Sequence, residues 1–361
     1  MDPASEPGME AGIGRLRVAA QRLVVAPGTD RPAPAEVVRW MTCLQGQDFP
    51  GVLASVALRS GSTDVTAMFA SREVVRSWPM RGTLHLVPAE DLHWMLSVTS
   101  ERLLAGAATR REYLGIDQAI LDTAESVAVE ALEGGHSLSR ADLLALWEPT
   151  GILEVPQRGY HLIWWLSQRG ITCWGPVEDG DQHLVLLDEW VPRPRRLERE
   201  EALAEWALRY FRSHGPATRQ DFQHWLGVTA ADAKAGVAGA REHLEVVLLD
   251  GVEHLMDPQT PALLEAAREP AAGVLLLPGF DEFLLGYKDR SAVLAPEHFE
   301  KIVPGRNGMF RPTVVDAGRV VGTWKRAGSG RNLRIEAEPF EAYMPATEAA
   351  LSGLFAAFPR R

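Results

Sequence analysis

The chain has 361 residues and a formal net charge of −11; 46% of its residues are hydrophobic and 24% are charged. This composition is typical of a folded globular protein, and the length predicts more than one hydrophobic core. The sequence has no run of eighteen apolar residues, and its two cysteines, Cys43 and Cys173, lack metal-ligand spacing with the histidines. We therefore expect a cytoplasmic protein that has no membrane span, no disulfide, no metal site and no cofactor.

The first part of the chain predicts mainly helices. Residues 1–12 are acidic and rich in Pro and Gly, which predicts a disordered tail. Apolar residues at helical spacing predict a helix over 37–44, and Asp48 ahead of a Phe-Pro pair predicts the N-cap of the next one. We expect a further helix at 71–78, ended by a proline, and a strand at 83–87.

Two later segments follow the same order of elements. Each has a helix that begins near a hydroxyl residue and an arginine, Ser139-Arg140 in one and Thr218-Arg219 in the other. Second helices are predicted at 160–168 and 231–243, and strand pairs at 171–174 with 184–187 and at 246–249 with 252–256. Helix-turn-helix followed by a hairpin is the winged-helix plan, and its recurrence strengthens the interpretation.

The pattern changes after Pro270. Strands are predicted at 273–278, 283–287, 312–315 and 319–324, and a terminal helix at 347–358. The predicted fold class is therefore α+β and helix-rich, with tandem winged-helix domains and a small C-terminal β-barrel-like unit. The expected domains are 13–112, 113–196 and 197–270 as three winged helices, 271–345 as the β-rich subdomain and 346–361 as the C-terminal helix.

The charge is unevenly distributed. Residues 101–270 carry 16 basic and 28 acidic side chains, whereas residues 302–334 carry seven basic side chains and one acid, Asp316. Such a basic stretch can bind phosphates while the rest of the surface stays acidic. From charge alone, a solvated face of the fold explains it equally well.

The segment Gln45-Gly46-Gln47-Asp48 is the first candidate for chemistry. A break at Gly46 would direct both carboxamides into one cleft, because residues two apart face the same way on an extended chain. The alternative is that these are polar residues at the joint between two helices.

Two further segments interrupt apolar runs with polar groups. Arg81 and His85 flank a predicted β turn, a position suited to phosphate contact; the alternative is a surface arginine and a structural histidine. Residues 277–290, which include Lys288 and Arg290, predict either a site or a β turn with an internal Asp–Arg pair.

Four motifs occur in order along nearly the whole chain. They are Leu44-Gln45-Gly46-Gln47-Asp48, residues 80–86 with Asp91, residues 278–287 with Arg290, and residues 311–315 leading to 322–325. Together they resemble the AlkZ-type family of winged-helix DNA glycosylases, in its Gln-x-Gln branch. The resemblance implies tandem winged helices curved around duplex DNA, with Gln45 and Gln47 as the catalytic pair and Asp48 as possible catalytic support.

The implied activity is hydrolysis of the N-glycosidic bond of N7-alkylated purines, including bulky antibiotic adducts or crosslinks, in DNA repair or self-resistance. With four lysines in the chain, we expect a monofunctional glycosylase. The expected partner is double-stranded DNA carrying alkylated bases, bound by a monomer in the bacterial cytoplasm and at the nucleoid. The expected DNA-binding residues are Arg81, His85, Lys288, Arg290, Arg311, Lys325 and Arg326.

Two other functions stay open at this point. In a winged-helix transcription regulator the glutamine pair would be structural, and palindromic operator binding would indicate that function. An interaction scaffold without a nucleic-acid partner fits the acidic middle of the chain, and salt-dependent DNA binding would exclude it.

Overall fold

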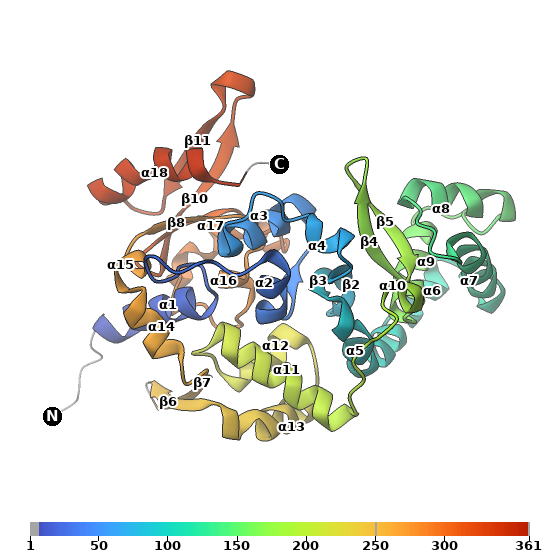
Figure 1. Cartoon of the computed structure of the whole chain (residues 1–361), viewed down its shortest axis with the longest axis horizontal. Helices are drawn as coiled ribbons and strands as arrows, with labels where there is room; N and C mark the ends of the chain where they lie inside the picture. The colour runs from blue at the N-terminus through green and yellow to red at the C-terminus, as the bar shows by residue number, and fades with distance from the viewer. Residues whose placement is uncertain (1–6, 250, 360–361) are drawn as a thin grey trace. The chain divides into compact units, whose positions relative to one another are not determined.

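The structure is a computed structural model that describes residues 7–249 and 251–359 (Figure 1). The fold is mixed α+β, and its sheets are antiparallel. The chain forms two compact units: unit 1 combines the described parts of Met1–Val65 and Leu203–Arg361, and unit 2 is Thr66–Ala202. Residues 13–112, expected as one domain, are therefore distributed over both units.

Unit 2 contains four strands in the order β3-β2-β4-β5. They are β2 (Val74–Met80), β3 (Thr83–Pro88), β4 (Thr172–Glu178) and β5 (Asp181–Leu186). The predicted strand at 83–87 is confirmed, but the predicted helix at 71–78 is wrong. The β-branched residues Val74 and Val75 favour a strand, and the register shifts between Ser77 and Met80, which accommodates Pro79.

Helices fill the rest of unit 2. They are α4 (Ala67–Ala70), α5 (Leu92–Gly106), α6 (Ala108–Tyr113), α7 (Gln118–Leu132), α8 (Arg140–Trp147), α9 (Arg158–Gln168) and α10 (Leu187–Trp190). The predicted helices after Ser139 and at 160–168 are confirmed. Ser139 caps α8 by accepting from the Asp142 N–H, and Trp147 and Leu162 lie in the unit's buried core. A β-bridge joins Leu138, just before α8, to Leu184 in β5.

The same order recurs along α11–β7. Its elements are α11 (Arg199–His214), α12 (Arg219–Leu226), α13 (Ala230–Ala240), β6 (Glu245–Leu249) and β7 (Val252–Met256). A bridge again joins the residue before the second helix, Ala217, to the second strand, at Leu255. Thr218 and Asp221 form a capping box at the start of α12.

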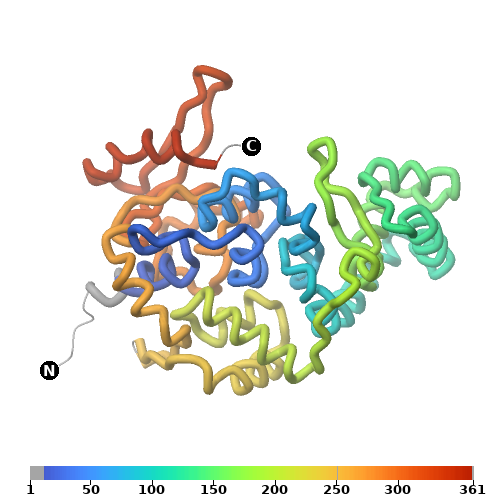
Figure 2. The backbone as a smooth tube through the Cα atoms, viewed as in Figure 1, coloured from blue at the N-terminus to red at the C-terminus, as the bar shows by residue number. Residues whose placement is uncertain are grey.

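The N-terminal part of unit 1 consists of α1 (Pro7–Ala20), α2 (Pro34–Met41), the short strand β1 (Leu44–Gln45) and α3 (Phe49–Ser60). Helix α1 contains residues 7–12, which were expected in the disordered tail; residues 1–6 lie outside the described residues. Helix α1, in blue, packs against α14 (Thr260–Ala266) and α15 (Arg268–Ala271), drawn in orange (Figure 2). Residues far apart in the sequence therefore share one core.

The C-terminal part of unit 1 contains a sheet with the order β11-β10-β9-β8. Its strands are β8 (Val274–Leu277), β9 (Thr313–Asp316), β10 (Arg319–Ala327) and β11 (Arg334–Pro339), accompanied by α16 (Glu282–Leu285), α17 (Phe299–Ile302) and α18 (Pro345–Ala357). The expected β-barrel-like unit is wrong, because β8 and β11 are the two edges of an open sheet in the described part of the chain. The β10–β11 hairpin projects beyond the rest of the sheet (Figure 1).

The predicted strand at 283–287 is also wrong. Asp281 accepts the Phe283 N–H at 3.0 Å and starts the helical turn α16, whose residues are all buried. A continuous apolar run of this length does not distinguish a helix from a strand by periodicity. No described helix combines the length and apolar character needed to cross a membrane.

Candidate active site

Gln45 and Gln47 are hydrogen-bonded to each other in a short link between two helices of unit 1. Gln45 Nε2 donates to Gln47 Oε1 at 2.8 Å, and the Gln47 backbone N–H donates to Gln45 Oε1 at 3.3 Å. Gln45 is 7% exposed, whereas Gln47 is exposed to solvent. The structure thus brings the two carboxamides together, with Gln47 as the solvent-facing member.

The backbone before this link is strained. Helix α2 ends at Met41, and its C-cap residue Thr42 has a φ of 69°, which is unusual for a β-branched residue. Such strain is maintained only where the surrounding structure fixes it, and it is frequent at functional sites. The turn at Thr42 ends α2 and leads the chain into β1, where Gln45 lies.

Asp48 begins α3 as the predicted N-cap. Its Oδ1 accepts the Gly51 N–H at 3.2 Å. A Cβ atom at Gly51 would lie 2.5 Å from Asp48 Oδ2, so glycine permits this close approach. The Asp48 carboxylate therefore holds the helix start while remaining exposed beside Gln47 in the chain.

A buried carboxylate from the candidate segment 277–290, not itself named as a site residue from the sequence, lies beside the glutamine pair. Glu282 is fully buried, and its Oε1 accepts the Gln45 backbone N–H at 3.3 Å. Its Oε2 accepts Trp225 Nε1–H at 3.0 Å and lies 3.4 Å from His214 Nε2. The sequence placed Glu282 in a motif and inside an apolar run, but neither signal identifies its hydrogen-bond partners.

Asp281, the preceding residue, pairs with Arg59 of α3. The guanidinium donates to both carboxylate oxygens, at 2.8 and 2.9 Å, and Ser55 Oγ also donates to the carboxylate. Burial by itself would raise the pKa of Asp281, but Arg59, Ser55 and the Phe283 N–H outweigh it and lower that pKa. The arginine partner of Asp281 therefore comes from α3 and not from the segment 277–290.

Arg81 and His85 lie in unit 2, on the β2–β3 hairpin. Arg81 and Gly82 have φ values of 53° and 68°, as the two central residues of a type I′ turn require. His85 is fully buried; its Nδ1 lies 2.8 Å from the Thr83 carbonyl and its Nε2 lies 3.3 Å from an Arg81 nitrogen. These contacts favour a structural role for His85 and leave Arg81, which is half-buried, nearer the surface.

The other predicted DNA-binding residues lie in unit 1. Lys288 and Arg311 are exposed. Arg290 is half-buried; it donates to the Leu284 carbonyl at 2.7 Å and its guanidinium lies 5.4 Å from the Phe310 ring. Arg290 therefore stabilises the loop after α16.

Lys325 and Arg326 lie on β10 and are exposed. Lys325 Nζ lies 3.1 Å from Glu336 of β11, which also accepts from Arg334 at 2.9 Å. Arg326 donates to the Pro359 carbonyl at 3.0 Å. Glu336 lies just beyond the basic stretch 302–334, so the hairpin is less positive than that stretch suggested.

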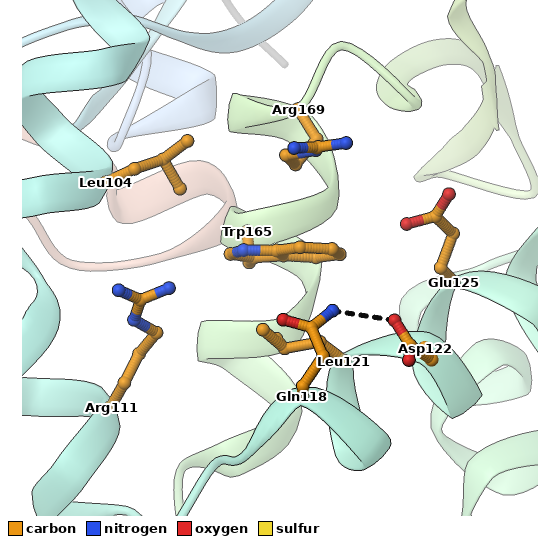
Figure 3. Close-up of a pocket in the computed structure, with 8 residues that line it drawn as sticks. All are labelled: Leu104, Arg111, Gln118, Leu121, Asp122, Glu125, Trp165 and Arg169. Atoms are coloured by element: carbon orange, nitrogen blue, oxygen red, sulfur yellow. Dashed lines mark hydrogen bonds between the residues drawn. The ribbon is translucent and has the colours of Figure 1, made fainter.

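A cavity of about 390 Å³ lies in unit 2 between α5, α6, α7 and α9 (Figure 3). The Trp165 ring lies at its centre below Arg169, with Arg111 on one side and Asp122 and Glu125 on the other. None of the predicted site residues lines it. The described residues also contain no group of three or more His, Cys, Asp or Glu side chains that could hold a metal ion.

Comparisons with known proteins confirm the resemblance to the AlkZ-type family. A family model described as DNA glycosylase AlkZ-like matches residues 38–360. An interstrand DNA cross-link repair glycosylase from Streptomyces sahachiroi is 29% identical over 325 residues, covering 84% of this chain and 85% of that protein. The solved structure of the DNA glycosylase AlkZ from the same organism has a TM-score of 0.77 at 24% identity, covering 99% of this chain and 98% of the other.

Proposed function

The chain belongs to the AlkZ-like DNA glycosylase family, and on this basis we propose that it hydrolyses the N-glycosidic bond of N7-alkylated purines in duplex DNA. One observation carries the proposal: Gln45 and Gln47 form a hydrogen-bonded carboxamide pair with Gln47 facing solvent. The regulator alternative is not favoured, because the family match spans nearly the whole chain.

Excision of such a base requires that water and the sugar be positioned more than it requires a strong base. Alkylation at N7 makes the purine cationic, so the base departs neutral and the sugar develops oxocarbenium character. The Gln47 amide can donate to water or the sugar through Nε2, which has no hydrogen-bond partner among the described residues, while Gln45 orients its Oε1. If proton removal is required, Asp48 is the nearest carboxylate along the chain.

We propose that two segments are winged helices that bind the duplex. The support is the shared order of helix, bridge, two helices and hairpin in α7–β5 and α11–β7. Exposed Lys288, Arg311, Lys325 and Arg326 would contact phosphates, with Arg81 as a further contact from unit 2.

We further propose that the substrates include interstrand crosslinks. The support is the similarity to the Streptomyces sahachiroi protein, whose name is that of a cross-link repair glycosylase. A monomer acting on the bacterial chromosome in the cytoplasm would suffice, because the glutamine pair and its supporting acid lie in one chain.

The test is a single-turnover assay on duplex DNA carrying one N7-alkylguanine, with a crosslinked duplex and an unmodified duplex in parallel. We expect free alkylated base, an intact abasic site and no protein–DNA adduct trapped by borohydride. Tight binding of an unmodified palindrome without base release from any duplex would instead identify a regulator.

A further inference from the structure

We propose that Glu282 is a positioning residue that holds the Gln45 peptide, and through it the Gln45–Gln47 pair, in the geometry for base excision. The inference rests on the proposed function of that pair. It concerns a residue 237 positions away in the sequence, joined to the site by one backbone hydrogen bond.

The two carboxylate oxygens of Glu282 face different donors. Oε1 accepts the Gln45 N–H at 3.3 Å, and Oε2 accepts Trp225 Nε1–H at 3.0 Å with His214 Nε2 at 3.4 Å. A fully buried carboxylate is costly unless donors surround it, so these groups are held in place around it. Because the Trp225 indole can only donate, Oε2 must remain an acceptor.

Holding the Gln45 peptide also holds Gln47. The two residues share hydrogen bonds of 2.8 and 3.3 Å, so a shift of the Gln45 backbone moves the exposed amide of Gln47. A displacement of about 1 Å at a reacting group can cost about a hundredfold in rate. The Glu282 contact therefore acts on the rate without touching DNA.

Glu282 has a rigid support. Asp281 beside it is bound to Arg59 of α3, the helix that follows the glutamine pair, and Gln21 Nε2 donates to the Glu282 carbonyl at 3.3 Å. A Cβ atom at Gly286 would lie 2.5 Å from the His214 ring, so glycine lets α16 pack closely on that histidine. Two adjacent acids thus fix the chain on both sides of Gln47.

The first experiment is Glu282→Gln, which preserves shape and leaves one acceptor oxygen for the N–H groups of Gln45 and Trp225. We expect single-turnover excision to fall about tenfold or more at unchanged duplex affinity. Hydrogen exchange at the Gln45 backbone N–H, which Glu282 accepts, should become faster. Asp257→Asn is the matched control, since it changes a buried carboxylate bound to Arg212 and the Gln259 N–H, away from the glutamine pair.

The second experiment is rescue by Trp225→Phe. Removing the indole N–H lets the oxygen of the amide in Glu282→Gln turn to the Gln45 N–H, so the double variant should excise within about threefold of Trp225→Phe alone. Rescue with restored Gln45 protection supports positioning. The proposal would be overturned if Glu282→Gln excised the base at the wild-type rate. It would also be overturned if hydrogen exchange at the Gln45 N–H were unchanged, or if Trp225→Phe gave no rescue. If the wild-type protein releases no base, the proposed function fails, and the exchange comparison still decides whether Glu282 holds the peptide.

Discussion

At the scale of single residues, Gln45 and Gln47 differ in what they can do. Gln45 is buried and uses both ends of its carboxamide on Gln47, whereas Gln47 keeps an amide nitrogen toward solvent. The buried residue is therefore suited to orienting its neighbour, and the exposed one to meeting water or the sugar. Their hydrogen bonds make the two side chains act together.

Substituting either glutamine should slow excision without unfolding the protein. An oriented hydrogen bond in a preorganised site is worth on the order of 3 kcal/mol, about a hundredfold in rate, and the good leaving group reduces this toward tenfold. Gln47→Ala should cost at least as much as Gln45→Ala, and the double variant little more than either. Single-turnover rates and melting temperatures measure this; full excision by a folded, DNA-bound double variant would remove the pair from the mechanism.

His161 predicts a response of stability to acid. Burial, together with Arg111 and Arg110, lowers the pKa of His161 to about 4, and its Nε2 has no hydrogen-bond partner among the described residues. His161 is therefore protonated below about pH 6.5 in the unfolded chain but only below about pH 4 in the folded chain. The contribution of neutral His161 to the free energy of unfolding is fully present above pH 6.5 and is lost as the pH falls toward 4.

We expect His161→Phe to lose less stability than the wild type between pH 6.5 and 4. Urea unfolding at several pH values measures the difference, with His243→Gln, an exposed histidine, as the control. Parallel pH profiles for His161→Phe and the wild type would mean that the pKa of His161 is the same in the folded and the unfolded chain.

At the scale of elements, α3 is fixed by two very different acids. Asp48 caps its first turn at the surface, and buried Asp281 neutralises Arg59 in its last turn. Losing an N-cap costs about 1 kcal/mol, whereas removing one partner of a buried ion pair costs about 3–5 kcal/mol. Asp281→Asn should therefore destabilise the protein more than Asp48→Ala in urea unfolding. Equal losses would mean that water compensates Arg59.

The β10–β11 hairpin allows a charge test of DNA binding. Glu336 accepts from both Lys325 and Arg334, so a phosphate must compete with it. Glu336→Gln should tighten binding to any duplex, and Lys325→Ala/Arg326→Ala should weaken it and lower the salt slope by about one for each phosphate that is no longer neutralised. The measurement is the affinity for duplex DNA over a series of salt concentrations, with Arg268→Ala as an exposed control. An unchanged slope of affinity against salt would mean that the DNA-binding surface lies elsewhere.

At the scale of the whole molecule, the sequence predicted the elements that local signals, such as helix caps and apolar spacing, specify. Caps such as Ser139 and Thr218 and regular apolar spacing located the two helix-and-hairpin segments. The short segments 71–78 and 283–287 were assigned wrongly, because five to eight residues carry no decisive periodicity. The open sheet and the Glu282 contact escaped prediction because each depends on which distant segments pair, information that spacing does not contain.

Unit 1 is interrupted by the whole of unit 2, and this has a consequence for synthesis. Gln45 leaves the ribosome 237 residues before Glu282, which at about 5–20 residues per second is roughly 10 to 50 s. During that interval Arg59 also lacks its ion-pair partner Asp281, while unit 2 is translated in full. The glutamines are therefore among the first residues made and among the last to be set in place, and a chain released before residue 282 carries both of them without a site.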